Sequence, residues 1–216
     1  MSNIYLYSLP LLLKGALITA EIAVAGMIFG TLLGILLVLL RISNVRLFEG
    51  LVTLYVSFIR GTPFLFQILI VFYSLSVMGL DLSNTLTGII AVGLNTAAFI
   101  SEVFRSGLNA IPKGHIEAAE ALGMSKWAIF IRIKMLQVFY IVKPQMVSEF
   151  INAIKVTPIL STIGVLEITR VATRIVSRRH HPVPVYIIAF VLYFIICSLL
   201  EIVQNKMQSS NITGQK

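Results

Sequence analysis

Cysteine and charged side chains are both scarce in this chain of 216 residues. Cys197 is the only cysteine, which excludes a disulfide framework and a cysteine cluster that binds a metal ion. Charged residues make up 12% of the chain and hydrophobic residues 57%, whereas about a quarter of an average soluble domain is charged. A water-soluble fold has no interior that could hide so much apolar surface. The composition therefore predicts an all-α integral membrane protein.

Acidic residues are fewer than basic ones, and the chain carries a net charge of +8. No RNA- or DNA-reading motif accompanies this charge, so we expect no nucleic-acid partner. The basic residues instead lie in the short segments between apolar runs, where they anchor a protein to anionic lipid and orient it in a membrane. His180 and His181 have no carboxylate or cysteine cluster beside them, so we predict no metal site.

Five apolar runs are long enough to cross a bilayer, which takes about 20 residues as a helix. A shorter apolar stretch at residues 4–13 precedes them, is interrupted by Pro10 and is a candidate for the membrane interface. The N-terminus has neither a basic region nor a small-residue cleavage site, so we expect the first run to be retained. We predict one domain, residues 1–216, with spans at residues 16–40, 51–80, 86–104, 138–166 and 183–203.

Lysine and arginine in the short loops predict the orientation, because cytoplasmic loops of membrane proteins are enriched in them. With the N-terminus outside and the C-terminus cytoplasmic, ten basic residues fall inside and five outside, and the loop at residues 112–135 is cytoplasmic. Four of the outer five are arginines, which either lie on anionic headgroups or form a docking surface for an external partner. The inner residues are Arg41, Arg46, Arg105, Lys113, Lys126, Arg132, Lys134, Lys143, Lys206 and Lys216; the outer residues are Lys14, Arg170, Arg174, Arg178 and Arg179.

The fourth run is unusually polar for a membrane span. A charge at the bilayer centre costs roughly 2.5–3.5 kcal/mol, so a helix that carries Glu149 and Lys155 cannot face lipid on all sides. A helix turns by about 100° per residue, which places the polar side chains of this run on one stripe. Such a stripe predicts either the lining of an aqueous path or a hydrogen-bonded seam between helices. The polar side chains that fall within about a third of its circumference are Gln145, Ser148, Glu149, Asn152 and Lys155.

A Gly-Thr-Pro break interrupts the second run, with Arg60, Thr62 and Gln67 around it. Gly and Pro at membrane depth leave backbone N–H and C=O groups without helical hydrogen bonds, so that protein or water must bond to them instead. Transporters use such broken helices at substrate sites. The alternative is a kink whose Arg60 reaches the headgroups, and the isolated Asn95 is suited to bond a neighbouring helix. The candidate substrate path consists of Arg60, Thr62, Gln67, Asn95, Glu149, Asn152, Lys155 and Thr157.

The central loop is small, charged and helix-forming, and reads HIEAAEALGMSKWAIF at residues 115–130. Pro112 suits a helix start, Gly123 suits a left-handed end, and Ser125 suits the cap of a second helix. We therefore predict two short helices joined by a hinge. A small-residue surface of this kind allows another protein to approach closely, although an ordinary connecting loop is the alternative.

This loop resembles the cytoplasmic EAA loop of permease subunits in ATP-binding-cassette (ABC) importers of the polar amino-acid uptake family. The segments FIRGTPFLFQ, SEVFRSGLNAIPKG, SEFINAIK and IGVLEITR resemble that family in the same order, over nearly the whole chain. The resemblance implies a permease rather than an enzyme, in which the loop, between spans three and four, is a coupling helix that contacts a separate ATPase. The coupling residues that it implies are Glu117, Ala118, Ala119, Leu122, Gly123 and Ser125.

The same resemblance implies two ATPase subunits that bind ATP and magnesium, while this chain lacks the phosphate loop G-x-x-x-x-G-K-[ST] and needs no cofactor of its own. It also implies a second permease (in a homodimer or heterodimer), an external substrate-binding protein, a polar amino-acid substrate and a bacterial inner membrane. Two departures stand out. Met135-Leu136 replaces a Leu-Pro pair, so we expect a softer helix break or one at Pro144. Val156 replaces a carboxylate, which argues against a cationic substrate.

The residues alone leave two further classes open. A self-contained ion- or proton-coupled carrier or channel could use Glu149 and Lys155 as a relay, and a purely structural membrane subunit would need neither. Dependence of transport on an ATPase separates the importer from the carrier.

Overall fold

The computed structural model describes residues 2–43 and 45–213, and every regular element in them is a helix. Three helices are long and unbroken: α1 (Ser2–Arg41), α4 (Asn84–Asn109) and α9 (Pro182–Thr213). Two further helices are bent: α2 (Arg46–Gly61) meets α3 (Phe64–Val77) at 114°, and the helix that ends at Ile163 meets α8 (Ile168–Arg179) at 47°. By length and composition these described residues hold three candidate membrane spans, or five if each bent pair is one span. Lys216, counted above on the inner side, lies outside them.

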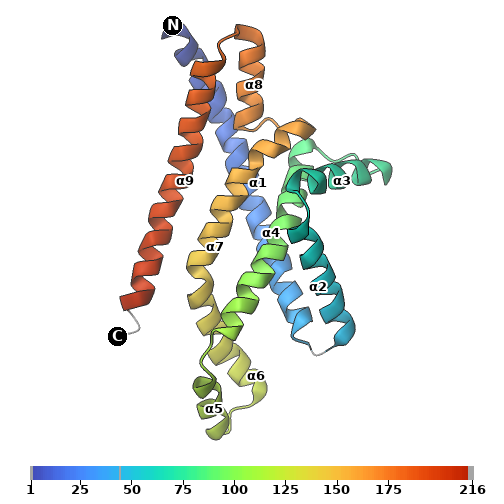
Figure 1. Ribbon diagram of the computed structural model, residues 1–216, viewed down its shortest axis with the longest axis vertical. Coiled ribbons are helices and arrows are strands. Elements are labelled where there is room, and N and C mark those ends of the chain that lie inside the picture. The colour runs from blue at the N-terminus through green and yellow to red at the C-terminus, as the bar shows by residue number, and fades with distance from the viewer. Residues whose placement is uncertain (1, 44, 214–216) are drawn as a thin grey trace.

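Figure 1 shows how these helices are arranged. The helices α1, α2, α4, α7 (Leu136–Val156) and α9 run along the long axis of the molecule, whereas α3 projects sideways. The start of α1 and the whole of α8 lie at one end. The opposite end holds α5 (Lys113–Ala121) and α6 (Lys126–Ile129). The predicted central loop and the basic segment at residues 170–179 are therefore at opposite ends of the molecule.

Helices α1 and α4 pack very closely because glycines line their contact. A Cβ atom at Gly30 would lie 2.6 Å from the Cβ of Thr96, and one at Gly34 would lie 2.8 Å from a methyl carbon of Ile100. Gly26 completes this row at four-residue spacing. Small residues at such a spacing let two membrane helices approach backbone to backbone. The pair forms the centre on which the other helices are arranged.

The expected interruptions at Pro10 and Pro144 are absent. Pro10 lies inside α1, so the stretch at residues 4–13 is continuous with the first span, and Pro144 lies inside α7. A proline removes one backbone hydrogen bond, which packing against neighbouring helices compensates in a membrane helix. The softer break expected at Met135-Leu136 takes the form of a π-helical turn, Phe130–Met135, that joins α6 to α7.

Candidate functional site

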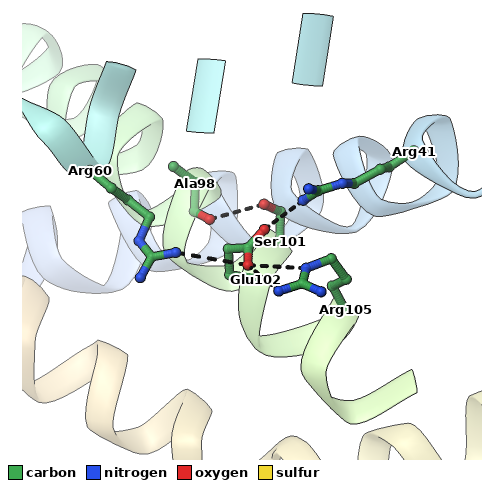
Figure 2. A network of polar contacts seen from close by, with 6 residues as sticks. All are labelled: Arg41, Arg60, Ala98, Ser101, Glu102 and Arg105. Carbon is green, nitrogen blue, oxygen red and sulfur yellow. Dashed lines mark hydrogen bonds and ion pairs between the residues drawn. The ribbon is translucent and has the colours of Figure 1, made fainter. Parts of the chain in front are cut away.

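A single carboxylate on α4 holds three arginines together (Figure 2). Arg41, at the end of α1, lies 2.5 Å from one oxygen of Glu102. Arg105 donates from Nε and Nη2 to the other oxygen at 3.0 and 2.7 Å, and Arg60 of α2 lies 3.8 Å from it. The Glu102 side chain is only 18% exposed. Three helices are thus tied to one partly buried charge.

Sequence reasoning missed this cluster, although it named Arg60. Glu102 belongs to the third apolar run, and a carboxylate inside a membrane span needs partners. That rule was the available signal. It could not identify the partners, since Arg41 is 61 residues away in the chain.

A polar cleft of about 530 Å³ opens beside the cluster. Arg60, Glu102 and Arg105 line one wall, and Gln145 and Glu149 of α7 line another. Gln145 donates a weak hydrogen bond of 3.4 Å to Glu149. The structure therefore brings together two residues of the predicted path, Arg60 and Glu149, in a cavity lined by both signs of charge.

Three other predicted path residues form a separate group that holds the helix break. The buried Gln67 donates to the carbonyl oxygens of Ile59 and Thr62 at 2.7 and 3.0 Å. Its own carbonyl accepts from Asn95 of α4 at 2.8 Å. These bonds satisfy the backbone groups that the break frees, as membrane depth requires. In this structure Thr62, Gln67 and Asn95 fix the bend between α2 and α3.

Of the remaining path residues, only Asn152 joins a group, because its exposed side chain interacts with Glu149 at the cleft. Lys155 is exposed on α7, whereas Thr157 is buried and donates to the carbonyl of Ile154 at 2.8 Å. Ser148 accepts from Gln204 of α9 at 2.6 Å. The polar stripe of α7 is thus divided between the cleft, a hydrogen-bonded seam with α9 and an open face.

A second buried carboxylate, Glu167, positions α8. Its oxygens accept from the backbone amides of Thr169 and Arg170 at 2.8 and 2.6 Å, and from the hydroxyl of Tyr193 on α9 at 2.7 Å. An N-cap of this kind satisfies the free amides of the first turn. Glu167 therefore anchors the start of α8 to α9.

The central loop folds as its residues predict. Gly123 is left-handed, at a φ of 74°, and follows Leu122, the C-cap of α5. The hydroxyl of Ser125 accepts from the amide of Ala128 at 3.3 Å and caps α6. Leu122 is 82% exposed, whereas Ala119 is only 3% exposed. The exposed members of the predicted coupling set are Glu117, Ala118, Leu122, Gly123 and Ser125.

Long apolar helices, a bent pair held by polar contacts and a charged cleft together indicate a multi-pass membrane protein with a polar cleft between its helices. The chain belongs to the family described as binding-protein-dependent transport system inner membrane component, whose model matches residues 26–210. It is therefore the permease subunit of an ABC importer and not itself an enzyme, since a partner ATPase performs the hydrolysis. Its family implies ATPase partners and a second permease.

Full-length similarity to named proteins supports this assignment. The chain is 33% identical to the arginine transport system permease protein ArtQ of Bacillus subtilis (strain 168), over 94% of this chain and 95% of that protein. It is 36% identical to the L-cystine transport system permease protein TcyB of the same organism, over 92% and 86%. A crystal structure of an amino acid ABC transporter with histidines matches at a TM-score of 0.90 and 27% identity, covering 95% of this chain and 96% of that one.

Proposed function

We propose that this permease imports a polar amino acid across the bacterial inner membrane. The observation that carries the proposal is the full-length similarity to permeases named for arginine and cystine, together with the fold of an amino acid ABC transporter. The relatives carry different substrates, so the shared property is the amino-acid class. Val156 places no carboxylate on α7 at a position where the resembled family has one, which favours a neutral or zwitterionic substrate over a cationic one.

The proposed mechanism is alternating access in a single-domain chain. Two ATPase subunits bind ATP with magnesium and close on each other, and a loaded binding protein docks at the end of the permease that holds α8. ATP binding can shift the permease between its outward-facing and inward-facing states only to the extent that ATP binds more tightly to the complex in one state than in the other. The exposed side of the central loop, with Leu122 and Ser125, is the surface that would contact the ATPase, because these residues beside α5 and α6 are accessible to a partner protein.

Reconstitution tests this proposal. Proteoliposomes that contain the permease and its ATPase should transport labelled amino acids only under two conditions. ATP must be on the side of the membrane that carries the ATPase, and a binding protein must be on the other side. Uptake that proceeds without the ATPase, under a proton or sodium gradient alone, would instead establish the self-contained carrier. Absence of any transport with the complete set would leave only a structural subunit.

The orientation is expected to have the N-terminus outside and the C-terminus in the cytoplasm. In a background with Cys197→Ser, a single cysteine from Arg174→Cys or Ser177→Cys should react with a membrane-impermeant thiol reagent in intact cells. One from Ser125→Cys should react only after the membrane is opened, because the central loop lies at the opposite end of the molecule (Figure 1). The reverse labelling pattern would overturn the orientation.

Substitution of Glu149 is expected to change uptake rather than assembly. Glu149→Gln preserves size and hydrogen bonding but removes one of the carboxylates that line the cleft with Arg60. We expect normal protein levels and a several-fold change in the apparent KM or in the preference among amino acids, measured by competitive uptake. Glu201→Gln, an exposed carboxylate on α9, is the matched control. Identical uptake kinetics for both variants and the parent would show that the cleft has a structural role and is not part of the substrate path.

A further inference from the structure

A second cavity, of about 330 Å³, lies between the start of α1 and α8. Its walls are mainly apolar and include Leu11, Ile18, Leu166 and Val171. Three cationic side chains also line it: Lys14 of α1, and Arg174 and Arg178 of α8. The cavity therefore combines apolar walls with positive charge from two different helices.

The sequence places these cations there through the amphipathic pattern of α8. One face of α8 carries Ile168, Ala172 and Ile175, which are buried in a core shared with α1 and α9. The arginines fall on the other face, at spacings of about one turn. Burial of the apolar face thus fixes the side of α8 on which Arg174 and Arg178 project, next to Lys14.

These positive charges have no acidic partner in the described part of the chain. The ion pairs of Glu102 involve other arginines and lie at a different place in the fold. Glu167 is the carboxylate that is closest in sequence to the cavity, and its oxygens are taken up by two backbone amides and the Tyr193 hydroxyl. No aspartate or glutamate is among the described residues that line the cavity. The cavity therefore presents positive charge that an anion could complement.

We propose that this cavity binds an anionic phospholipid, with the headgroup phosphate at Lys14, Arg174 and Arg178 and part of an acyl chain along Leu11 and Ile18. Arginine recognises phosphate with two parallel hydrogen bonds, and basic pockets between membrane helices bind anionic headgroups. A lipid fits better than a soluble protein because the cavity lining is mainly apolar and is partly formed by a membrane-spanning helix, α1.

A nearby aromatic residue supports this placement. The guanidinium of Arg179 lies 4.6 Å from the centre of the Tyr7 ring, and Tyr7 also lines the cavity. Tyrosine rings gather at the level of lipid headgroups. Beside the cavity, α1 presents a row of exposed apolar side chains suited to lipid, Leu9, Leu13 and Leu17. The phosphate site would thus be level with the headgroups of the adjacent leaflet.

Native mass spectrometry of the permease–ATPase complex tests the proposal directly. The purified complex is delipidated by detergent exchange and titrated with phosphatidylglycerol or phosphatidylcholine of the same acyl chains, and stepwise binding constants are read from the lipid adducts. We expect the first phosphatidylglycerol on each permease to bind at least about tenfold more tightly than phosphatidylcholine, since each cation near a headgroup contributes to attraction. Equal constants for the two lipids in the parent complex would overturn the proposal without any variant.

Two variants with equal loss of charge locate the site. The cavity variant carries Lys14→Gln, Arg174→Gln and Arg178→Gln, and should lose the preference for phosphatidylglycerol at an unchanged melting temperature. The control variant, with Arg46→Gln, Lys113→Gln and Lys143→Gln, removes three exposed cations elsewhere and should retain it. A preference that survives in the cavity variant, or disappears in both, contradicts the assignment. If the cavity variant keeps its lipid but loses stimulation by the binding protein, the surface docks a protein instead.

Discussion

Replacing Glu102 with alanine is expected to destabilise the permease more than loss of any exposed carboxylate. The substitution leaves Arg41, Arg60 and Arg105 converging on one another without the charge that pairs them. Removing one partner of a fully buried ion pair typically costs about 3–5 kcal/mol. We expect a smaller cost here because the Arg60 and Arg105 side chains are 49% and 41% exposed. The melting temperature of the solubilised complex should fall clearly, and uptake should be lost with it.

The matched control is Glu49→Ala, which removes an exposed carboxylate from α2. A surface substitution of this kind usually changes stability by less than about 0.5 kcal/mol. A double-mutant cycle then isolates the pair itself: Arg41→Met should destabilise the parent but stabilise the Glu102→Ala background, because it relieves repulsion there. Equal melting temperatures for the Glu102→Ala and Glu49→Ala variants would show that the cluster contributes nothing to stability.

The parts of the fold that were predictable from sequence are those that depend on local chemistry. Apolar runs identified the spans because bilayer thickness sets their length, and the break before Pro63 was visible as a Gly-Thr-Pro sequence. The hinge of the central loop was equally local, since a left-handed position after a helix requires a residue such as Gly123. Ser125 followed from the same reasoning about helix ends.

The parts that could not be predicted depend on which helices become neighbours. The helical period placed Ser148 and Glu149 on one stripe, but only the position of α9 shows that Ser148 bonds to Gln204 instead of facing the cleft. Likewise Gln67 was assigned to the substrate path, and the approach of Asn95 on α4 shows how its amide is satisfied. Ala119 reads as an exposed small residue, yet the fold of the loop buries it. Pairing between distant segments leaves no trace in a single sequence.

The central loop offers the second large effect, through Gly123. The turn after α5 closes with hydrogen bonds from the amides of Gly123 and Met124 to the carbonyls of Glu120 and Ala119, at 2.9 and 3.1 Å. This arrangement requires the left-handed backbone of Gly123. No atom lies within 4 Å of where a Cβ would stand at this residue. A substitution here therefore perturbs the turn through backbone strain alone, without a steric clash.

Gly123→Val is expected to weaken communication between the permease and its ATPase. A β-branched residue in the left-handed region costs about 1–2 kcal/mol, which lowers the equilibrium constant for forming the native turn by roughly tenfold. Uptake and substrate-stimulated ATP hydrolysis should fall together, while membrane insertion and protein level remain normal because no span is changed. Gly114→Val is the matched control, since Gly114 is equally open but lies within α5 with ordinary helical geometry. We expect that control to transport at close to the parent rate. Normal uptake by Gly123→Val would show that the loop only connects α4 to α7, because a strained turn at a coupling surface could not leave transport unchanged.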